Sequence, residues 1–318
     1  MKNNTVAVFT SGGDAPGMNA CIKGIVDYAF KNDMKILAIR SGYKGLIAED
    51  FIELTPEMVK DNMHRAGTFI KTSRYHDFFK PEIQKKAVEI LKNHNINYLI
   101  GIGGDGTYRG LIELKKLGIN VIGIPGTIDN DINYSETSLG FDTAYNAATE
   151  NIKAASESMR SFDRVFVAEV MGRHSGNIAL NVAIASGADI VAVPEKPITA
   201  DNICKKVNAV KAKGNNSPVI IVHDYYPYYD ELLNKLRNVC KLEARSQIIG
   251  FVQRGASPTA YDTILGWSYG IHAIELCLKN KFGIAIGTQN NRIFDCDIEK
   301  SLTYPSNFDI DLYNKFDI

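Results

Sequence analysis

The sequence has no excess of charge of either sign, because 36 Lys and Arg side chains balance 36 Asp and Glu side chains among its 318 residues. Proteins that bind nucleic acid without sequence preference need a basic surface, so this composition argues against a nucleic-acid partner. The sequence also lacks an apolar run long enough to cross a bilayer, and no secretory leader precedes the first apolar stretch. We therefore expect a protein with no membrane partner.

Cysteine and histidine are few and scattered. The five cysteines, at positions 21, 204, 240, 277 and 296, do not have the spacing of metal ligands, and the six histidines form no pair at such a spacing. Both absences argue against a zinc site. Scattered cysteines are typical of free thiols in a reducing compartment, so the sequence predicts a cytoplasmic protein.

No Gly/Ser-rich or Pro-rich linker divides the chain, and no short repeat recurs. Apolar runs typical of buried strands instead alternate with helical patterns along the whole length. The predicted strands cover residues 6–10, 35–39, 98–102, 121–124, 164–170, 189–193, 218–223, 246–250 and 284–287. This alternation favours an α/β fold with mostly parallel sheets. Because these units are too many for one compact sheet, we predict two doubly wound domains with the active site in the cleft between them.

The most informative stretch covers residues 98–131. A short apolar run is followed by the sequence GGDGT at 103–107, a helical pattern, a second apolar run, and the turn GTIDND at 126–131. Glycines let backbone N–H groups approach phosphate, and the start of the following helix adds positive dipole. The three carboxylates of Asp105, Asp129 and Asp131 follow two successive strands. Carboxylates beside phosphates suggest a magnesium ion and a base, which phosphoryl transfer requires.

A second strand–glycine–helix unit lies at the beginning of the chain. The apolar run at 6–10 is followed by SGGDAPGMNA at 11–20, in which Pro16 suits the first turn of a helix. The unit is another candidate phosphate site. It is not a Walker A loop, because no Gly-Lys-Ser/Thr sequence follows the glycines.

These motifs resemble those of the ATP-dependent 6-phosphofructokinase family, bacterial type. The family's other signatures appear in order as GFDTA at 140–144, EVMGRHSG at 169–176 and VQRGASPTA at 252–260, so the resemblance covers nearly the whole chain. It implies transfer of the ATP γ-phosphoryl group to the 1-hydroxyl of fructose 6-phosphate, giving fructose 1,6-bisphosphate and ADP in glycolysis. It also implies an ATP-binding domain at residues 1–138 and 251–318 and a sugar-phosphate-binding domain at 139–250.

The resemblance implies specific roles on the nucleotide side. Asp105 is expected to hold Mg²⁺. The residues expected at ATP are Gly13, Arg74, Tyr75, Gly104, Asp105, Gly106 and Thr107. Gly106 and Gly126 further favour ATP over pyrophosphate as the donor, since the pyrophosphate-using branch typically has aspartate and lysine at these positions.

On the substrate side, the resemblance implies that Asp129 is the base and that Thr127 and Arg173 complete the catalytic set. The residues expected at fructose 6-phosphate are Thr127, Asp129, Asp131, Arg164, Met171, Gly172, Arg173, Asp224, Arg245, Phe251 and Arg254. Planar guanidinium groups suit bidentate capture of phosphate. In the family, the residues matching Arg164 and Arg245 reach across from a neighbouring subunit, so the resemblance implies a homotetramer with shared active sites.

Four positions depart from the family pattern. Asp224 stands where a longer glutamate is usual, and Phe251 stands where a histidine is usual, which puts substrate affinity in question more than the chemistry. An effector pocket is expected at Lys23, Asp27, Ser156, Asp189 and Lys213. Asp27 and Ser156 stand where arginine is usual in it, so we expect weak control by ADP and phosphoenolpyruvate.

Two other interpretations share part of this pattern. NAD kinases and lipid kinases also carry GGDGT, but they do not explain the PGTIDND, EVMGRHSG and VQRGASP sequences. A regulatory phosphofructokinase-like subunit that binds sugar phosphate without turning it over would explain Asp224 and Phe251. The intact Asp105, Asp129 and Arg173 oppose that hypothesis. An assay with ATP and fructose 6-phosphate distinguishes the three.

Overall fold

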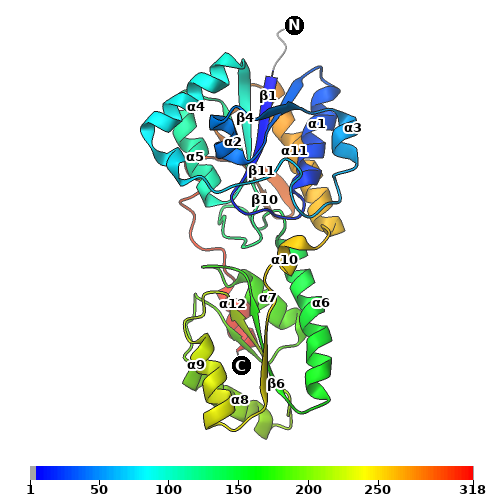
Figure 1. The fold of residues 1–318 in the computed structure, drawn as a ribbon, viewed down its shortest axis with the longest axis vertical. Coiled ribbons are helices and arrows are strands. Elements are labelled where there is room, and N and C mark those ends of the chain that lie inside the picture. Colours follow the sequence, from blue (N-terminus) through cyan, green and yellow to red (C-terminus); the bar gives the residue numbers. More distant parts are fainter. Residues whose placement is uncertain (1–4, 318) are drawn as a thin grey trace. The chain divides into compact units, whose positions relative to one another are not determined.

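The structure, a computed structural model, describes residues 5–317 of the chain. Contacts divide the chain into two compact units (Figure 1). Unit 1 comprises Met1–Thr143 and Arg254–Asn307, and unit 2 comprises Ala144–Gln253 and Phe308–Ile318. Strands and helices alternate in both, so the predicted α/β class is confirmed. Within residues 5–317, no helix combines the length and apolarity needed to cross a membrane.

The ranges of the units differ from the predicted domain ranges. The crossings lie at 143/144 and 253/254 rather than at 138/139 and 250/251. The C-terminal segment from Phe308, predicted to lie with the first domain, belongs to unit 2. One reason is local, because Lys206 of unit 2 forms an ion pair with Asp317. Which ligand each unit binds stays a prediction.

Unit 1 contains one seven-stranded sheet in the order β11-β10-β5-β4-β1-β2-β3. All neighbouring pairs are parallel except the two at the edges, β2–β3 and β10–β11. The bounds of its strands and helices are β1 Thr5–Ser11, α1 Met18–Phe30, β2 Lys35–Ile39, α2 Gly42–Ile47, β3 Phe51–Glu53, α3 Pro56–Lys60, η1 His76–Phe79, α4 Pro81–Asn93, β4 Ile96–Gly103, α5 Asp105–Lys116, β5 Val121–Pro125, α11 Ala260–Leu278, β10 Ile284–Gln289 and β11 Arg292–Asp297.

Helices cover both faces of this sheet. Side chains of α2, α4 and α5 pack with Phe9, Ile39 and Leu99 in one core, while α1 and α11 lie on the other face (Figure 1). β1 is buried along its whole length, as a central parallel strand requires. The strands β1, β4 and β5 end in register. Ser11 at the end of β1 pairs with Gly103 at the end of β4, and Gly103 pairs with Pro125 at the end of β5. The glycine-rich motifs that follow these strands are therefore brought to one edge of the sheet.

Unit 2 contains a four-stranded, fully parallel sheet in the order β7-β8-β6-β9. Its core lies between this sheet and the helices α8 and α9, with Val165, Val167 and Leu236 among its side chains. The chain enters unit 2 within α6 and leaves it within α10. The bounds are α6 Phe141–Arg160, β6 Val165–Val170, α7 Asn177–Ser186, β7 Ile190–Ala192, α8 Ala200–Ala212, β8 Val219–His223, α9 Tyr229–Asn234, η2 Lys235–Val239, β9 Ala244–Ile248, α10 Val252–Gly255 and α12 Ile310–Phe316.

A buried carboxylate joins the two segments of unit 1 where the chain leaves and returns. Asp262, in the first turn of α11, is fully buried. It accepts hydrogen bonds from the Gly140 N–H at 2.9 Å, the Thr143 N–H at 2.8 Å and the Thr143 hydroxyl at 2.5 Å. Burial nevertheless raises its pKa to about 6. Next to it, the Thr259 hydroxyl lies 2.6 Å from the Asp142 carboxylate.

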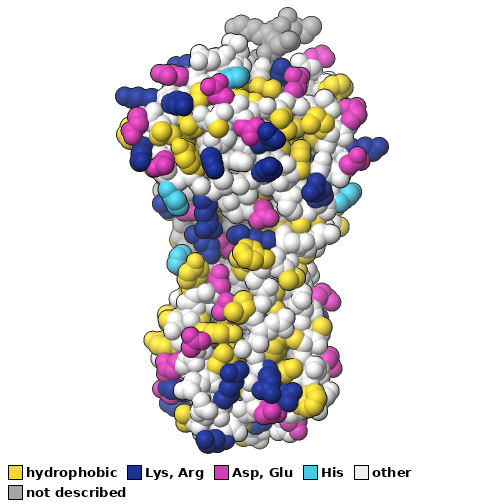
Figure 2. Space-filling model, viewed as in Figure 1, with side chains coloured by type: hydrophobic (Ala, Val, Ile, Leu, Met, Phe, Trp, Pro, Cys, Tyr) yellow, Lys and Arg dark blue, Asp and Glu magenta, His cyan; other side chains and the backbone are white. Residues whose placement is uncertain are grey.

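Some elements were not expected from the sequence. The sequence did not predict helix α2 or the short edge strands β3 and β11. Both strands pair antiparallel with a neighbour, so pairing rather than an apolar run defines them. On the face shown in Figure 2, acidic and basic side chains are intermixed in both units, in agreement with the neutral net charge.

Glycines allow α1 and α11 to touch along their backbones. A Cβ on Gly270 would lie 2.2 Å from the Cys21 carbonyl oxygen and 2.7 Å from the Ile25 nitrogen. A Cβ on Gly24 would lie 2.3 Å from the Trp267 carbonyl oxygen. Backbone atoms cannot move aside as a flexible side chain can, so the two helices would have to separate.

We therefore expect Gly270→Ala to lower the free energy of unfolding by about 3 kcal/mol, the upper range for overpacking. Urea unfolding followed by circular dichroism measures this loss. The matched control is Gly255→Ala, where a Cβ meets no atom within 4 Å and φ is not positive. Equal stability of the Gly270 variant and wild type would contradict the close contact of α1 with α11.

Candidate active site

The GGDGT motif connects β4 to α5 as predicted. Gly104 is the N-cap of α5, and Asp105 is its first residue. A Cβ on Gly103 would lie 2.2 Å from the Thr107 Oγ1, so glycine is required there. The buried Thr107 hydroxyl donates a hydrogen bond to the Ser11 carbonyl at 3.2 Å, which ties α5 to the end of β1. Around Gly106 a Cβ would meet nothing within 4 Å, so space beside the helix start is open.

The loop at residues 65–75 is held against the start of α1 by one buried side chain. The Asn19 amide donates hydrogen bonds to the carbonyls of Arg65 and Gly67, both at 2.9 Å, and accepts one from the Phe69 N–H at 3.0 Å. Its side chain is buried. Sequence reasoning did not single out Asn19, although it lies in the SGGDAPGMNA motif.

The same loop reaches the glycine turn after β1. The Gly12 N–H donates to the Ser73 carbonyl at 3.2 Å, and the Thr72 hydroxyl donates to the Gly12 carbonyl at 3.0 Å. Arg74, which follows directly, is exposed. The structure thus brings the loop that carries Arg74 and Tyr75 beside the turn that carries Gly13, as a common nucleotide site requires.

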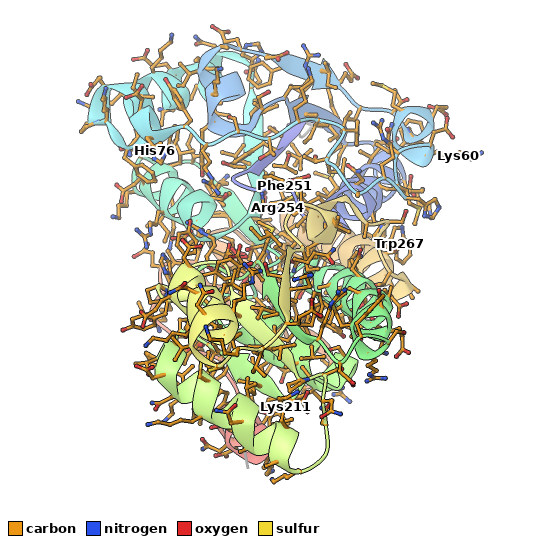
Figure 3. All side chains as sticks on the ribbon, turned by 60° about the horizontal axis from the view of Figure 1, so that its bottom comes forward. Lys60, His76, Lys211, Phe251, Arg254 and Trp267 are labelled. Atoms are coloured by element: carbon orange, nitrogen blue, oxygen red, sulfur yellow. The ribbon has the colours of Figure 1, made fainter. Side chains whose placement is uncertain are left out.

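Arg254 lies against this turn in unit 1. A Cβ on Gly13 would lie 2.5 Å from one guanidinium nitrogen of Arg254, so no other residue fits there while Arg254 keeps this position. The guanidinium is also 3.9 Å from the Asp14 carboxylate. Arg254, which Figure 3 labels, is the first residue of the segment in which the chain returns to unit 1. The predicted sugar-phosphate contact Arg254 therefore neighbours the predicted ATP contact Gly13.

The turn after β5 places Asp129 in a buried position. Its side chain is 3% exposed, and its N–H donates to the Thr127 hydroxyl at 3.3 Å. The buried Ser138 hydroxyl contacts the Thr127 carbonyl at 2.6 Å and the Asn130 side-chain oxygen at 3.1 Å. These contacts fix the turn that carries the predicted base. Neither Asn130 nor Ser138 was predicted to support it.

In unit 2, two of the predicted phosphate-binding arginines share one carboxylate. Arg164 lies just before β6 and Arg245 lies in the neighbouring strand β9. The Glu243 carboxylate is 2.9 Å from the Arg164 Nε and 3.4 Å from an Arg245 nitrogen. The Arg164 hydrogen bond is the main reason that the pKa of Glu243 is lowered. Glu243 was not predicted, and its carboxylate contacts both guanidinium groups.

The segment Met171–Arg173 is fixed through its backbone. The buried Gln253 side chain accepts from the Met171 N–H at 2.9 Å, and the Asp224 carboxylate accepts from the Arg173 N–H at 2.8 Å. Gly172 has φ +150° and a Cβ there would meet the Ser175 carbonyl oxygen at 2.6 Å. Arg173 itself has a left-handed backbone with φ 55°, a conformation that costs free energy in a non-glycine residue.

Burial shifts three titratable groups around this segment. It raises the pKa of Asp224 and the pKa of Glu169, and the nearby Asp224 carboxylate adds to the effect on Glu169. It lowers the pKa of His223, whose ring is buried beside them. Asp224, predicted to contact substrate, thus has a backbone partner already.

Phe251, where the family resemblance implied a histidine, is 79% exposed, and Figure 3 labels it. Its ring therefore does not pack into the core of unit 2. A substitution by histidine at this position has space and leaves no cavity behind.

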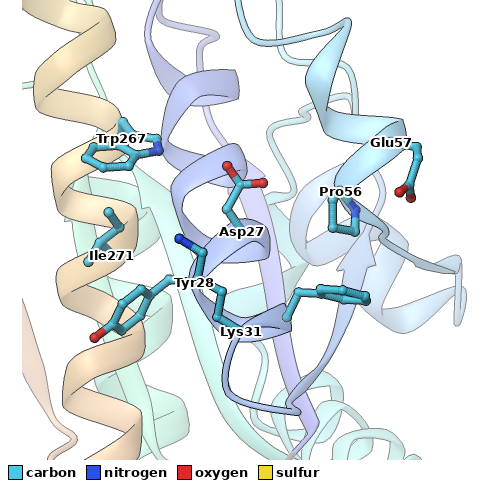
Figure 4. A pocket seen from close by; sticks show the side chains of 8 residues that line it. Asp27, Tyr28, Lys31, Pro56, Glu57, Trp267 and Ile271 are labelled. Carbon is cyan, nitrogen blue, oxygen red and sulfur yellow. The ribbon is translucent and has the colours of Figure 1, made fainter.

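The predicted effector residues lie in both units. Lys23 and Asp27 form an ion pair on α1, and Asp27 lines a cavity of about 310 Å³ between α1, α3 and α11 (Figure 4). The cavity is also lined by Tyr28, Phe30, Lys31, Pro56, Glu57, Trp267 and Ile271. In unit 2, the Asp189 carboxylate accepts from the Val219 N–H and the Asn215 amide, Ser156 is buried, and Lys213 caps α8. The effector role of this set stays a prediction.

Asp105 is the predicted magnesium ligand. Its side chain is 45% exposed and lies 3.3 Å from Arg109 one turn along α5. Residues 5–317 contain no group of three or more His, Cys, Asp or Glu side chains that could enclose a metal. Nucleotide-bound Mg²⁺ needs no such cage, since it takes one or two carboxylates and completes its shell with water and phosphate oxygens. A single accessible carboxylate beside the open space at Gly106 fits that mode.

Comparison with known proteins agrees with this arrangement. The sequence model of the family described as phosphofructokinase matches residues 5–277. A Clostridium botulinum (strain Hall) protein named ATP-dependent 6-phosphofructokinase is 40% identical over 310 residues, which are 98% of this chain and 97% of that protein. The chain belongs to the phosphofructokinase family. A protein of the same name from Lactobacillus gasseri is 40% identical over 293 residues, which are 92% of each chain.

Solved phosphofructokinases share the fold. The Saccharomyces cerevisiae enzyme superposes with a TM-score of 0.87 at 28% identity, over 94% of this chain and 45% of the yeast chain. This phosphofructokinase therefore spans less than half of the yeast chain. A pyrophosphate-dependent phosphofructokinase from Marinobacter aquaeolei superposes with a TM-score of 0.88 over 97% of this chain and 86% of that chain. At 21% identity, that likeness concerns the fold alone.

The raised pKa of Asp224 predicts a pH dependence of stability. A carboxyl group whose pKa is higher in the folded state favours folding while it is protonated, and that advantage is lost as the pH rises through the folded-state pKa. Asp224→Asn keeps an oxygen that can accept from Arg173 but cannot ionise. We expect the variant to lose less stability than wild type between pH 4 and pH 8.

Urea midpoints measured across this pH range test the expectation. The control is Asp230→Asn, which removes an exposed carboxylate in the same unit. Parallel pH profiles for wild type and Asp224→Asn would show that Asp224 ionises equally easily in the folded and unfolded states.

Proposed function

We propose that this phosphofructokinase transfers the γ-phosphoryl group of ATP to the 1-hydroxyl of fructose 6-phosphate, giving fructose 1,6-bisphosphate and ADP. The observation that carries the proposal is the 40% identity over 98% of the chain to a protein named ATP-dependent 6-phosphofructokinase. The fixed turns at Asp129 and Gly104 support it, because phosphoryl transfer depends mainly on positioning and charge stabilisation.

Asp129 is the proposed base. It accepts the proton of the attacking sugar hydroxyl, and the Thr127 contact to its N–H holds the turn in place. Its burial limits the access of water to the carboxylate. Arg173 is proposed to stabilise the charge that develops on the transferring group, and its left-handed backbone aims the side chain from a fixed turn.

The nucleotide is proposed to bind at the aligned ends of β1 and β4. Gly13, Gly104 and Gly106 leave its phosphates room to approach the backbone, and the exposed Arg74 supplies positive charge. Asp105 is proposed to hold Mg²⁺ together with the phosphate oxygens. When bound, the ion neutralises phosphate charge and orients the transferring group.

The sugar phosphate is proposed to meet the arginines of unit 2. Arg164 and Arg245 are held together by Glu243, and phosphate competes for the same guanidinium groups. All but the first residue of β9 are exposed, including the apolar Ile248 at 61%. An exposed edge strand of this kind favours a covering partner, which supports the proposed homotetramer with shared sites. Light scattering that gives the mass of one chain would contradict it.

We also propose a cytoplasmic location, because glycolytic substrates are cytoplasmic and all five cysteines are free thiols. Cell fractionation tests this proposal. Recovery of the protein only outside the cytoplasmic fraction would contradict it.

The test of the reaction is a coupled assay on the purified full chain with fructose 6-phosphate and Mg²⁺. Two arms supply ATP or pyrophosphate as donor. We expect turnover with ATP only, since a hydrogen at Gly106 leaves open space where the ATP chain must pass. Turnover with pyrophosphate alone would overturn the choice of donor, and binding of fructose 6-phosphate without turnover of either donor would overturn the assignment as an enzyme.

We expect Asp129→Asn to lower kcat by about 10²–10⁴, the usual worth of a positioned base. Folding and ATP binding should be unchanged, because the amide occupies the same buried space. Steady-state kinetics and calorimetric titration with a nonhydrolysable ATP analogue measure the two effects. Retention of the wild-type kcat would exclude Asp129 as the base.

We expect Phe251→His to lower KM for fructose 6-phosphate roughly tenfold to a hundredfold with little change in kcat. A hydrogen bond to a charged phosphate is worth about 1.5–3 kcal/mol, and the exposed position of Phe251 accepts the smaller ring without strain. Phe251→Leu is the matched control, since it changes the side chain without adding a donor. An unchanged KM in Phe251→His would show that another group already makes the contact.

A further inference from the structure

Two cysteines of unit 2 come from different elements and meet at the edge of its core. Cys204 lies on α8 and is buried in the core cluster, with 8% of its surface exposed. Cys240 is the C-cap of η2 and packs against the same cluster while remaining partly exposed. The two cysteines thus share one core cluster, and Cys240 is near enough to affect the Cys204 thiol. The other three cysteines of the chain are buried in unit 1.

Neighbouring ion pairs hold the two elements in this register. The Lys235 ammonium group is 2.6 Å from the Asp201 carboxylate of α8 and 2.7 Å from the Glu231 carboxylate of α9. Cys204 lies one helical turn after Asp201 on α8. Cys240 lies one turn after Lys235, because the Cys240 N–H donates to the Lys235 carbonyl at 2.9 Å. The two cysteines thus lie one turn further along the same two elements that the Asp201–Lys235 ion pair joins.

We propose that Cys204 and Cys240 form a dithiol site that a low-molecular-weight disulfide, such as oxidised glutathione, converts into an intramolecular disulfide. Thiols on two elements that pack together in this way need little backbone movement to be joined. The site lies outside the residues proposed for phosphoryl transfer, so it does not depend on that activity. Disulfides in reducing compartments are usually transient and regulatory, which suits a thiol pair at a partly exposed position.

The exchange proceeds in two balanced steps. The more accessible Cys240 loses its proton and attacks one glutathione sulfur, which forms a Cys240–glutathione disulfide and releases the other glutathione as a thiol that gains the proton. Cys204 then loses its proton and attacks the Cys240 sulfur. The bond to glutathione breaks, and the second glutathione leaves with that proton. Two protein thiols are oxidised, and one glutathione disulfide is reduced to two thiols.

The environment of Cys204 makes the second step the slower one. Burial, with a further contribution from the adjacent Cys240, raises the pKa of the Cys204 thiol to about 12. Only the thiolate attacks, so the rate of closure should rise about tenfold per pH unit between pH 7 and pH 9.

The experiment treats the reduced full-length protein with oxidised glutathione, blocks the remaining thiols with an alkylating reagent, and follows the intact mass and the peptides. In wild type we expect the loss of two thiols, one peptide pair joined through Cys204 and Cys240, and only transient glutathione adduct. In Cys204→Ser the adduct on Cys240 should persist. In Cys240→Ser the Cys204 thiol should remain alkylatable on unfolding. Cys296→Ser is the control and should behave as wild type.

A stable glutathione adduct in wild type would overturn the proposal, as would complete retention of both thiols. Because these readings come from wild type, they hold even if a variant fails to fold. A closure rate that does not change with pH would overturn the assignment of Cys204 as the second attacking group. The joined form should unfold at a temperature higher by roughly 5 °C or more, since the bond constrains the unfolded chain.

Discussion

The structure of unit 1 depends on the buried carboxylate of Asp262. This unit is made of two segments that are far apart in the sequence, and Asp262 at the start of the second segment binds the backbone at the end of the first. A carboxylate without donors would be costly to bury, whereas three donors from Gly140 and Thr143 compensate for much of the loss of water. The sheet order places β10 beside β5, so both segments must be joined before the sheet is complete.

Hydrogen bonds from a buried or half-buried side chain to the backbone recur around the candidate site. Asn19, Ser138, Gln253 and Asp224 are side chains that bind the backbone of a loop rather than one another. Loops at the ends of parallel strands have few backbone partners, and these side chains supply them. The residues proposed to touch substrate therefore lie on turns that are fixed without ligand. Such preorganisation is what phosphoryl transfer demands of a protein.

The sequence predicted those helices and strands that residues close together in the chain determine. The strand–glycine–helix units at 6–20 and 98–117 were predicted because buried strands, glycines and a helical apolar face each have a short-range pattern. The edge strands β3 and β11 and the position of the segment from Phe308 depend on partners distant in sequence, which no local pattern encodes. Glu243 and Asn19 were missed for the same reason. A charged residue before a strand signals nothing until the arginines that it binds are placed, and an amide in a helix signals nothing until its loop is placed.

The discontinuity of unit 1 has a consequence for synthesis on the ribosome. β10 and α11, which complete its sheet and cover α1, lie beyond the whole of the main segment of unit 2 in the sequence. A growing chain therefore displays the apolar face of α1 and the open side of β5 while residues 144–253 are being translated. Unit 2 has all four strands of its sheet at that stage and can condense first, although its last helix, α12, follows at the end. The N-terminal part of this phosphofructokinase is thus the part that a nascent chain must keep from aggregating the longest.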